Sequence, residues 1–392
     1  MTWKVSDPMS EKLKFMGLAL SKQRTIAGLC REFGISRTTA YKYLERYEQD
    51  GLEGLKERSR APKVMPRETR REIRDLLIGA RKTHPTWGPR KLRVWLGERN
   101  PDLELPYPST IGDILKREGL VQPRSRRRKP PPVSSAPSDV RKPNQEWNAD
   151  YKGEFRLGNG DYCFPLTVTD SYSRYLLTVR ALRSTANSAA RPCFDAAFRE
   201  FGLPEAIRTD NGCPFAGTGL ARLSGLSVHW VKLGIRLVRG RPHHPQDNGR
   251  HERMHRTLKA ETPRPPAQQW RGQQSRFDAF QEEYNCERPH EALGQKPPAR
   301  LYRASSRPFP ARIPDCEYPG HYEVRTVGSG GIFAWHSQQI FVSHSLRGER
   351  IGLVEIEDGV WRVYFAHLEL GVLDEQELKG RRTGKVYAMS PV

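Results

Sequence analysis

The chain has 392 residues, and its 66 Lys and Arg against 45 Asp and Glu give a formal net charge of +21. This excess favours a polyanionic partner such as nucleic acid, because solubility alone is served better by acidic residues. No apolar run approaches the roughly 18 residues of a membrane-spanning helix, so we expect no membrane partner. The six cysteines form no C-x-x-C pair, which favours reduced thiols in a cytoplasmic protein over a disulfide framework or a zinc finger.

Residues 1–60 predict an all-helical, helix-turn-helix DNA-binding domain. Thr25 and Ser36 stand where N-caps of two helices are expected, over 26–33 and from 37 to about 47. Core positions at helical spacing in the third helix leave a polar, basic leading turn facing outward, made of Arg37, Thr38, Thr39, Tyr41 and Lys42. A helix-turn-helix protein presents this face to the major groove. The alternative is a plain three-helix bundle with a solvated basic face.

Residues 64–123 predict a second, helix-turn-helix-like domain. Its expected helices cover 67–82, a stretch that opens at Pro89, and a third that Ser109 caps. This domain could extend the footprint on DNA or be purely structural. Residues 124–145 form an expected basic linker without core-forming positions. We interpret it as a tether along phosphates, and nuclear localisation stays open; its basic residues include Arg124, Arg126, Arg127 and Arg128.

Residues 146–302 predict an α/β domain with a mixed five-stranded sheet. We expect strands over 147–157, 162–170, 174–182, 206–208 and 235–239, and helices over 185–201, 219–232 and beyond 249. Residues 318–392 carry short strand-like runs divided by Gly-containing turns, which predict a small C-terminal β-barrel. Its basic tail (Lys379, Arg381, Arg382, Lys385) is by default a charged surface.

Three acidic residues in distinctive local sequences carry the expected chemistry. Asp150 falls within the first strand, Asp210 at the end of a later strand, and Glu252 in an early turn of a helix. Strand ends at one sheet edge are rigid mounts for ligands. Carboxylate oxygens without thiolates favour Mg²⁺ or Mn²⁺, and two such ions can activate and cleave a phosphodiester. A single Asp-Asn-Gly is also a good hairpin turn, so the signal lies in the combination.

The chain resembles DDE transposases of the IS481 and IS3 type, which share the RNase H-like fold of retroviral integrases. The resemblance is carried by Trp147–Asp150, Thr209–Gly212, His243–Arg253, His255–Lys259 and the run from Tyr284 to Gly294 that contains Arg288-Pro289-His290. It covers about residues 10–300, and the C-terminal part is similar, more loosely, to the β-barrel of Mu-like transposases. The spacing from Asp210 to Glu252 is longer than usual in the family, and we expect residues 217–228 to hold the extra turn.

The resemblance implies that Asp150, Asp210 and Glu252 are the catalytic, metal-binding triad, with two Mg²⁺ or Mn²⁺ ions. It implies double-stranded DNA as partner, both transposon ends and target, with strand transfer through a 3′-OH. A reaction on two ends requires at least a homodimer on DNA. Among nearby bases, we expect Arg241, Arg256 and Lys259 to contact phosphates. Asp170 and Asp247 are competing acids, expected in a turn and a loop.

Two other functions fit parts of the sequence. His251-Glu252-Arg253-Met254-His255 spells H-E-x-x-H, a zinc protease motif in which the histidines bind zinc and Glu252 is the general base. The dense basic charge around it argues against a cationic metal there and suits phosphate. The second alternative is a sequence-specific helix-turn-helix regulator with an inactive integrase-like core. The complete acidic triad argues against it. The role of His251 and His255 stays open at this point.

Overall fold

The computed structural model describes residues 7–58, 68–121, 139–217, 219–240, 249–378 and 386–389. It divides into two compact units, Met1–Glu68 and Thr69–Val392. Several expected features lie outside the described residues: the linker arginines 124 and 126–128, Arg241, the competing acid Asp247, and the basic tail 379–385.

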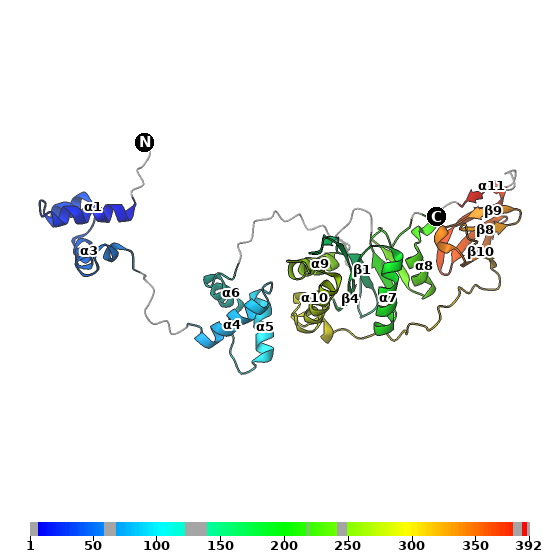
Figure 1. The fold of residues 1–392 in the computed structure, drawn as a ribbon, viewed down its shortest axis with the longest axis horizontal. Coiled ribbons are helices and arrows are strands. Elements are labelled where there is room, and N and C mark those ends of the chain that lie inside the picture. Colours follow the sequence, from blue (N-terminus) through cyan, green and yellow to red (C-terminus); the bar gives the residue numbers. More distant parts are fainter. Residues whose placement is uncertain are drawn as a thin grey trace. The chain divides into compact units, whose positions relative to one another are not determined.

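The first unit consists of α1 (Pro8–Leu20), α2 (Ile26–Glu32), α3 (Arg37–Asp50) and a 3-10 turn (Gly51–Leu55) (Figure 1). The sequence places the helix starts, because the Thr25 and Ser36 hydroxyls accept hydrogen bonds from the backbone N–H groups of Gly28 (3.3 Å) and Thr39 (3.1 Å). Leu29, Ala40 and Leu55 are fully buried between the helices. The predicted helix-turn-helix region is therefore confirmed as helical.

The second unit begins with α4 (Arg71–Thr83), α5 (Pro89–Arg99) and α6 (Pro108–Arg117), which pack around the buried Trp87. One expectation here is wrong, because Ser109 does not cap α6. Pro108 occupies the first helical position, which suits its fixed φ, and Tyr107 is the N-cap without a side-chain hydrogen bond.

A mixed sheet follows, built from β1 (Trp147–Tyr151), β2 (Phe155–Arg156), β3 (Tyr162–Asp170), β4 (Leu176–Leu182), β5 (Ala206–Thr209) and β6 (Arg236–Arg239). Five strands lie in the order β4-β3-β1-β5-β6, in which β3 is antiparallel to its neighbours and β1, β5 and β6 are parallel. The expected count of five is one short. The first predicted strand breaks at Gly153, whose φ is +80°, and resumes as β2, which pairs with the start of β3.

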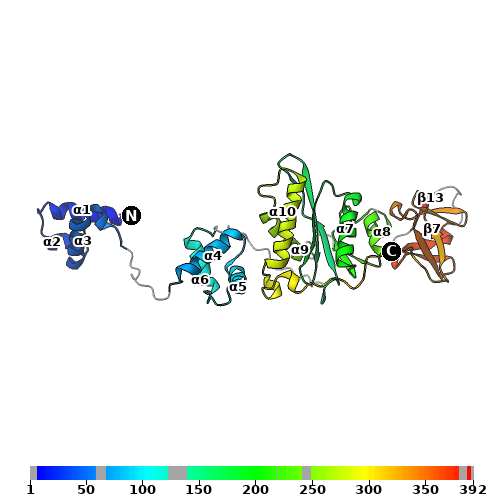
Figure 2. The same ribbon diagram turned by 60° about the horizontal axis from the view of Figure 1, so that its bottom comes forward.

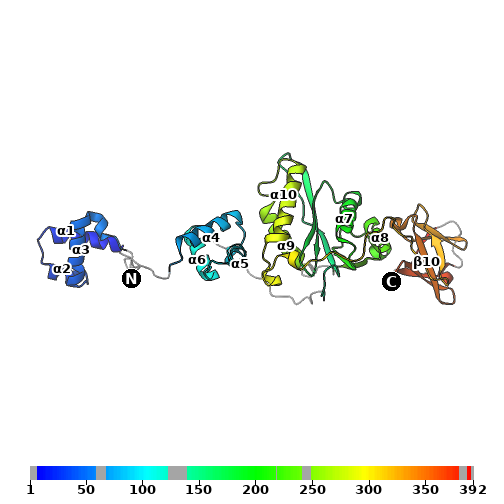
Figure 3. The ribbon, with the colours of Figure 1, turned by 90° about the horizontal axis from the view of Figure 1, so that it is seen from below.

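Helices cover both faces of this sheet. Successive side chains of β3 point to opposite faces, so each face offers residues against which a helix packs. Leu166 and Val168 face α7 (Asn187–Phe201), and Cys163 faces α9 (Gly249–Glu261) and α10 (Trp270–Glu282). The views in Figures 1 and 2 show α7 on one side of the strands and α9 with α10 on the other. The view from below shows the same layering (Figure 3). The core of the domain is thus a three-layer sandwich.

Two predicted long helices are interrupted. The stretch beyond 249 ends at Glu261 and restarts as α10, followed by a π-helical turn (Glu283–Glu287). The stretch 219–232 becomes a 3-10 turn (Leu220–Arg222) and α8 (Gly225–Lys232), because Ser224 forms a capping box with Ser227. The 3-10 turn contacts β12 (Leu368–Asp374) of the C-terminal region.

The C-terminal strands form two open sheets. One has the order β12 (Leu368–Asp374), β11 (Val360–Phe365), β10 (Arg350–Glu357), β7 (Glu323–Thr326); the other has β13 (Val386–Ala388), β9 (Gln338–Phe341), β8 (Ile332–Trp335). Both contribute to a core that includes Val228 and Val231 of α8. The expected closed barrel is not seen among the strands that the structure describes. In the same parts of the chain, no helix combines the length and the apolar composition needed to cross a membrane.

Candidate active site and nucleic-acid interface

Parallel pairing brings two of the three candidate carboxylates to one sheet edge. β1 runs parallel to β5 with Trp147 opposite Ile207 and Asn148 opposite Arg208. Asp150 therefore lies near the carboxyl end of β1, and Asp210 directly follows the last residue of β5. The turn after β5 is fixed, since the Asp210 carboxylate accepts a hydrogen bond from the N–H of Gly212 (3.1 Å).

The third carboxylate comes from α9, whose residues separate into three faces. His251, His255 and Leu258 form the buried face on the sheet. Glu252 shares a second, exposed face with Arg256 and Lys259, at the i, i+4, i+7 spacing of a helix. The third face carries two further arginines, Arg250 and Arg253. One helix therefore presents a candidate metal ligand beside two of the bases expected to contact phosphate.

The pKa of Asp150 is affected by both of the other acids. It is raised to about 7, first by burial and then by the negative charge of Asp210, with a smaller contribution from Glu252. Negative charge of this kind, on hard oxygen donors, fits a site for Mg²⁺ or Mn²⁺. Asp210 and Glu252 are exposed, and Asp150 is half-buried, so the edge is open to substrate.

Two buried histidines are connected to the backbone of Asp150 by hydrogen bonds through one shared hydroxyl group. Thr167 lies opposite Asp150 in β3, and its Oγ1 donates to the backbone carbonyl of Asp150 (3.0 Å). Nε2 of both His251 and His255 lies 2.7 Å from the same oxygen. Because the hydroxyl has a single proton, which goes to the carbonyl, both histidines must donate to Thr167. The Nδ1 of His251 then accepts from the Thr169 hydroxyl (2.8 Å).

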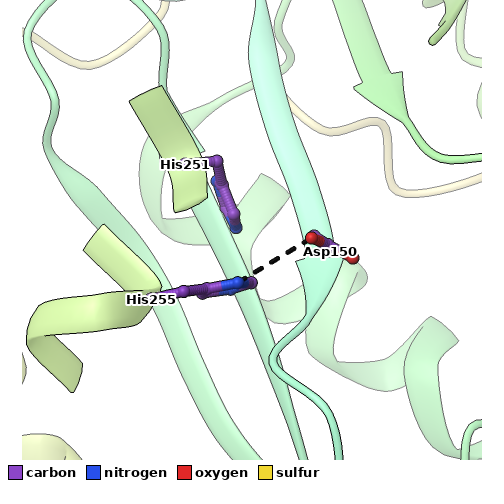
Figure 4. A group of neighbouring side chains, drawn as sticks. All are labelled: Asp150, His251 and His255. Atoms are coloured by element: carbon purple, nitrogen blue, oxygen red, sulfur yellow. Dashed lines mark ion pairs between the residues drawn. The ribbon is translucent and has the colours of Figure 1, made fainter. Parts of the chain in front are cut away.

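His255 also faces the carboxylate itself. Its Nδ1 lies 3.8 Å from Oδ2 of Asp150, and Figure 4 shows the ring directed toward that side chain with His251 beside it. Burial lowers the pKa of His251 to about 3 and also lowers that of His255, so both rings are neutral near pH 7. The two histidines hold β1 and α9 together through β3.

This network bears on the zinc protease alternative. The ligand atoms of Asp150, His251 and His255 do lie within 4.8 Å of one another, close enough to share an ion. However, both nitrogens of His251 are already hydrogen-bonded to threonine hydroxyls, and Glu252 points from a different face of the helix. A zinc ion held by His251 would have to displace one of those bonds. The spacing is better explained by packing against the sheet.

The competing acid Asp170 has a structural role. It is fully buried at the end of β3 and accepts hydrogen bonds from the N–H of Asn144 (2.8 Å) and from the N–H (2.7 Å) and hydroxyl (2.6 Å) of Ser173. These bonds satisfy both carboxylate oxygens and close the turn to β4. Asp170 is therefore engaged in this turn and is closed off from solvent.

The predicted DNA-reading residues lie at the start of α3. Arg37, Thr38, Tyr41 and Lys42 are exposed, as a reading face requires. Thr39 is half-buried, and its hydroxyl is hydrogen-bonded to that of Ser36 (2.8 Å), so part of its polar capacity serves the cap. The outward face of α3 is thus narrower than the sequence alone indicates.

Sequence reasoning missed a second group of basic residues near the candidate active site. Arg250 and Arg253 line a cavity with Arg174, from the turn between β3 and β4, and Arg288. The i, i+3 spacing in α9 was visible in the sequence. No local signal marked Arg174, because only the fold brings that turn to α9.

Comparisons with known proteins agree with this architecture. Helix-turn-helix and homeodomain-like family models match residues 11–63 and 39–115. Two integrase core domain models match residues 140–245 and 233–298. The class is therefore a protein with helical DNA-binding-type domains ahead of an integrase-like core. A model for the C-terminal domain of IS481 family transposases matches residues 322–380. Together these matches support a transposase of the IS481 type with an integrase-like core.

Viral polyproteins are more distant relatives. The chain is 31% identical over 121 residues to the Gag-Pol polyprotein of baboon endogenous virus (strain M7), which covers 30% of this chain and 6% of that protein. It is 31% identical over 121 residues to the Pol polyprotein of feline endogenous virus ECE1. That alignment covers 30% of this chain and 11% of that protein. The chain thus spans only a small part of the length of these relatives.

Two solved structures are also similar at low identity. The HTLV-2 integrase catalytic core domain in complex with magnesium matches with 15% identity and a TM-score of 0.33, covering 41% of this chain and 98% of that one. A simian T-cell lymphotropic virus intasome in complex with PP2A regulatory subunit B56 gamma matches with 16% identity and a TM-score of 0.37, covering 75% of this chain and 97% of that one.

Proposed function

We propose that this chain is a DNA transposase that binds transposon end repeats through its N-terminal helices and catalyses metal-dependent strand cleavage and strand transfer to target DNA. The observation that carries the proposal is the parallel pairing of β1 with β5, which brings Asp150 and Asp210 to one sheet edge, with Glu252 on an exposed face of α9; the raised pKa of Asp150 agrees with it. A strand, a strand end and a helix contribute these acids. Three carboxylates from separate elements at one open edge are what phosphodiester chemistry with divalent ions requires.

The three acids are the proposed catalytic and metal-binding residues. Their oxygens suit Mg²⁺ or Mn²⁺, and we propose two ions per site. When bound, such ions activate the attacking oxygen and neutralise charge on the leaving one. Asp150 is held on a central strand, with its backbone carbonyl fixed by Thr167. Asp210 is held by the turn after β5, and Glu252 by the packing of α9 on the sheet.

The DNA contacts follow from exposed positive charge. The α3 face with Arg37 and Lys42 is the proposed reader of end repeats, and Arg256 and Lys259 beside Glu252 are proposed to neutralise phosphates near the reacting bond. Since two element ends must be joined to one target, we propose at least a homodimer in the assembled complex. Double-stranded DNA, as element ends and as target, is the proposed partner.

The test is cleavage of labelled element ends by single-residue variants in Mg²⁺. Asp150→Asn, Asp210→Asn and Glu252→Gln each remove a ligand charge with little change of shape, so cutting should fall roughly 10³-fold or more while end binding persists. Asp278→Asn, at an exposed carboxylate on α10, is the matched control and should cut normally. Full cleavage by Glu252→Gln would remove that residue from the mechanism.

A further inference from the structure

A cavity of about 190 Å³ lies against the third face of α9, the face that neither packs on the sheet nor carries Glu252. Arg250 and Arg253 reach it from the helix, and Thr257 continues the same face one turn later. Its other walls include Arg174, Arg288 and Lys91, together with the acid Glu291. The space is large enough for several water molecules, and hence for a phosphate group.

The positive charge around this cavity is largely unbalanced. Arg288 is paired with Glu261 (2.8 Å), and Glu291 is paired with Arg90 (2.8 Å). The remaining bases Lys91, Arg174, Arg250 and Arg253 have no carboxylate within ion-pair distance among the residues described around them. Four cations therefore line a space whose one acid is already engaged elsewhere.

Two of the guanidinium groups in the cavity wall bind the same backbone carbonyl. Both Arg174 (2.6 Å) and Arg250 (3.4 Å) donate to the backbone carbonyl of Ser171, in the turn between β3 and β4. Each keeps further N–H groups for another acceptor, because a guanidinium has five. This arrangement holds two planar cations side by side before any ligand arrives.

These neighbouring positive charges destabilise one another's protonated forms. The pKa of Arg174 is lowered to about 10, first by burial and then by the positive charges of Arg250 and, to a smaller extent, Arg253. The pKa of Lys91 is lowered to about 8, first by burial and then by the positive charge of Arg288. Beside them, Nε2 of His290 is buried and has no hydrogen-bond partner among the described residues. An anion in the cavity would relieve this repulsion, because each positive charge would gain an opposite one nearby.

We propose that this cavity binds one phosphate of the DNA backbone next to the bond that is cut, an inference that rests on the proposed function. Guanidinium groups match phosphate geometry, and the cavity shares α9 with Glu252, which immediately precedes Arg253. A phosphate held on this face fixes the strand relative to the second face of the same helix. The site positions the substrate and takes no part in the chemical step. It also gives a role to the Arg288-Pro289-His290 motif, whose outer residues line the cavity.

The experiment pairs protein variants with neutralised phosphates. Duplexes that carry the terminal sequence of the element encoding this chain receive a single uncharged methylphosphonate at successive linkages. Their affinity is measured without divalent metal for the wild-type chain and for Arg253→Gln. Arg253 is exposed, so its replacement leaves the fold intact, which the thermal unfolding midpoint verifies. Arg271→Gln, at an exposed arginine on α10, is the control of equal charge.

At one linkage or two adjacent linkages, the neutral duplex should bind the wild-type chain about tenfold more weakly. Arg253→Gln should weaken binding of the native duplex by a similar factor, and the two changes together should cost no more than either alone. Arg271→Gln should combine independently with every linkage. If Arg253→Gln also adds independently at every linkage, the cavity does not hold a phosphate, although the proposed function stands. A wild-type chain that binds no ends overturns both.

Discussion

The helices α3 and α9 are both short and rich in basic residues, yet they use their charge in opposite ways. In α3 only Ala40 is buried, and the basic leading turn is exposed to solvent. In α9 four side chains are buried, two of them histidines, and the arginines occupy separate faces around a candidate carboxylate ligand. The basic residues of α3 form an exposed surface on their own. Those of α9 form a site only together with residues of other elements.

The difference shows where each function resides. The α3 face depends on local features, namely a Ser36 cap and helical spacing, so substitutions there should change affinity and little else. The α9 site depends on contacts with Thr167 and Thr169, residues more than eighty positions earlier in the chain. Substitutions of the residues that contact the buried face of α9 should therefore change both the stability of the fold and the geometry of the candidate active site.

The largest expected effect among tests of this contrast comes from Thr167→Val. The change keeps the side-chain shape but removes the hydroxyl that His251, His255 and the Asp150 carbonyl share. Leaving buried polar groups unsatisfied should reduce the free energy of unfolding of the catalytic domain by about 2–3 kcal/mol. Chemical denaturation followed by tryptophan fluorescence measures this loss.

Thr178→Val on β4 is the matched control. Thr178 is also buried in the sheet, and its hydroxyl makes no hydrogen bond among the residues that the structure describes. This variant should lose less than about 1 kcal/mol. Equal losses in the two variants would mean that the network under α9 contributes no more than an ordinary buried threonine.

A smaller effect is expected from pH, through His290 beside α9. Its pKa is lowered to about 3, first by burial and then by nearby positive charges, so the folded chain keeps this ring neutral. Between pH 7 and 5 the unfolded chain gains a proton here and the folded chain does not, so stability falls as pH falls. The contribution is about 2 kcal/mol over that interval.

Unfolding titrations at pH 7 and pH 5 test this. The decline in the free energy of unfolding should be about 2 kcal/mol smaller for His290→Gln than for the wild-type chain. His321→Gln, at an exposed histidine of the C-terminal region, should decline as the wild-type chain does. An unchanged decline in His290→Gln would show that the ring is already protonated or exposed in the folded protein.

The smallest expected effect concerns α3. The double variant Arg37→Gln/Lys42→Gln removes two exposed charges from the proposed reading face, and affinity for element ends should weaken about tenfold, with a shallower salt dependence. The thermal midpoint of the first unit should not change, because neither side chain is buried. Lys14→Gln on α1 is the control, and a loss of affinity as large in that variant would contradict a specific role for α3.

The sequence predicted the elements whose determinants are local. The Thr25 and Ser36 caps, the strand from Tyr162 to Asp170 and the position of Asp150 within β1 follow from short patterns. Ser109 misled because proline at the preceding position competes for the helix start. The individual C-terminal strands were predicted from the sequence. Their spacing along the chain does not determine whether they close into a barrel or form open sheets.

The candidate site was predictable only in part. The three acids could be named, since each has a distinctive neighbourhood. His251 and His255 could not be assigned, because i, i+4 histidines serve equally a zinc site and a helix face packed on a sheet. The deciding partners, Thr167 and Thr169, lie in a strand without any motif. The basic cavity escaped notice for the same reason, since Arg174 joins it only through the fold.

The most direct test of the account is to locate a divalent ion bound to the full chain. Crystals grown with Mn²⁺ and measured at the manganese absorption edge give its position by anomalous scattering, whatever the activity. The account predicts an ion held by Asp150 and Asp210, on the side where Glu252 projects, with His251 still bonded to Thr167 and Thr169. An ion held instead by His251 and His255, with Asp210 and Glu252 turned away, would contradict it.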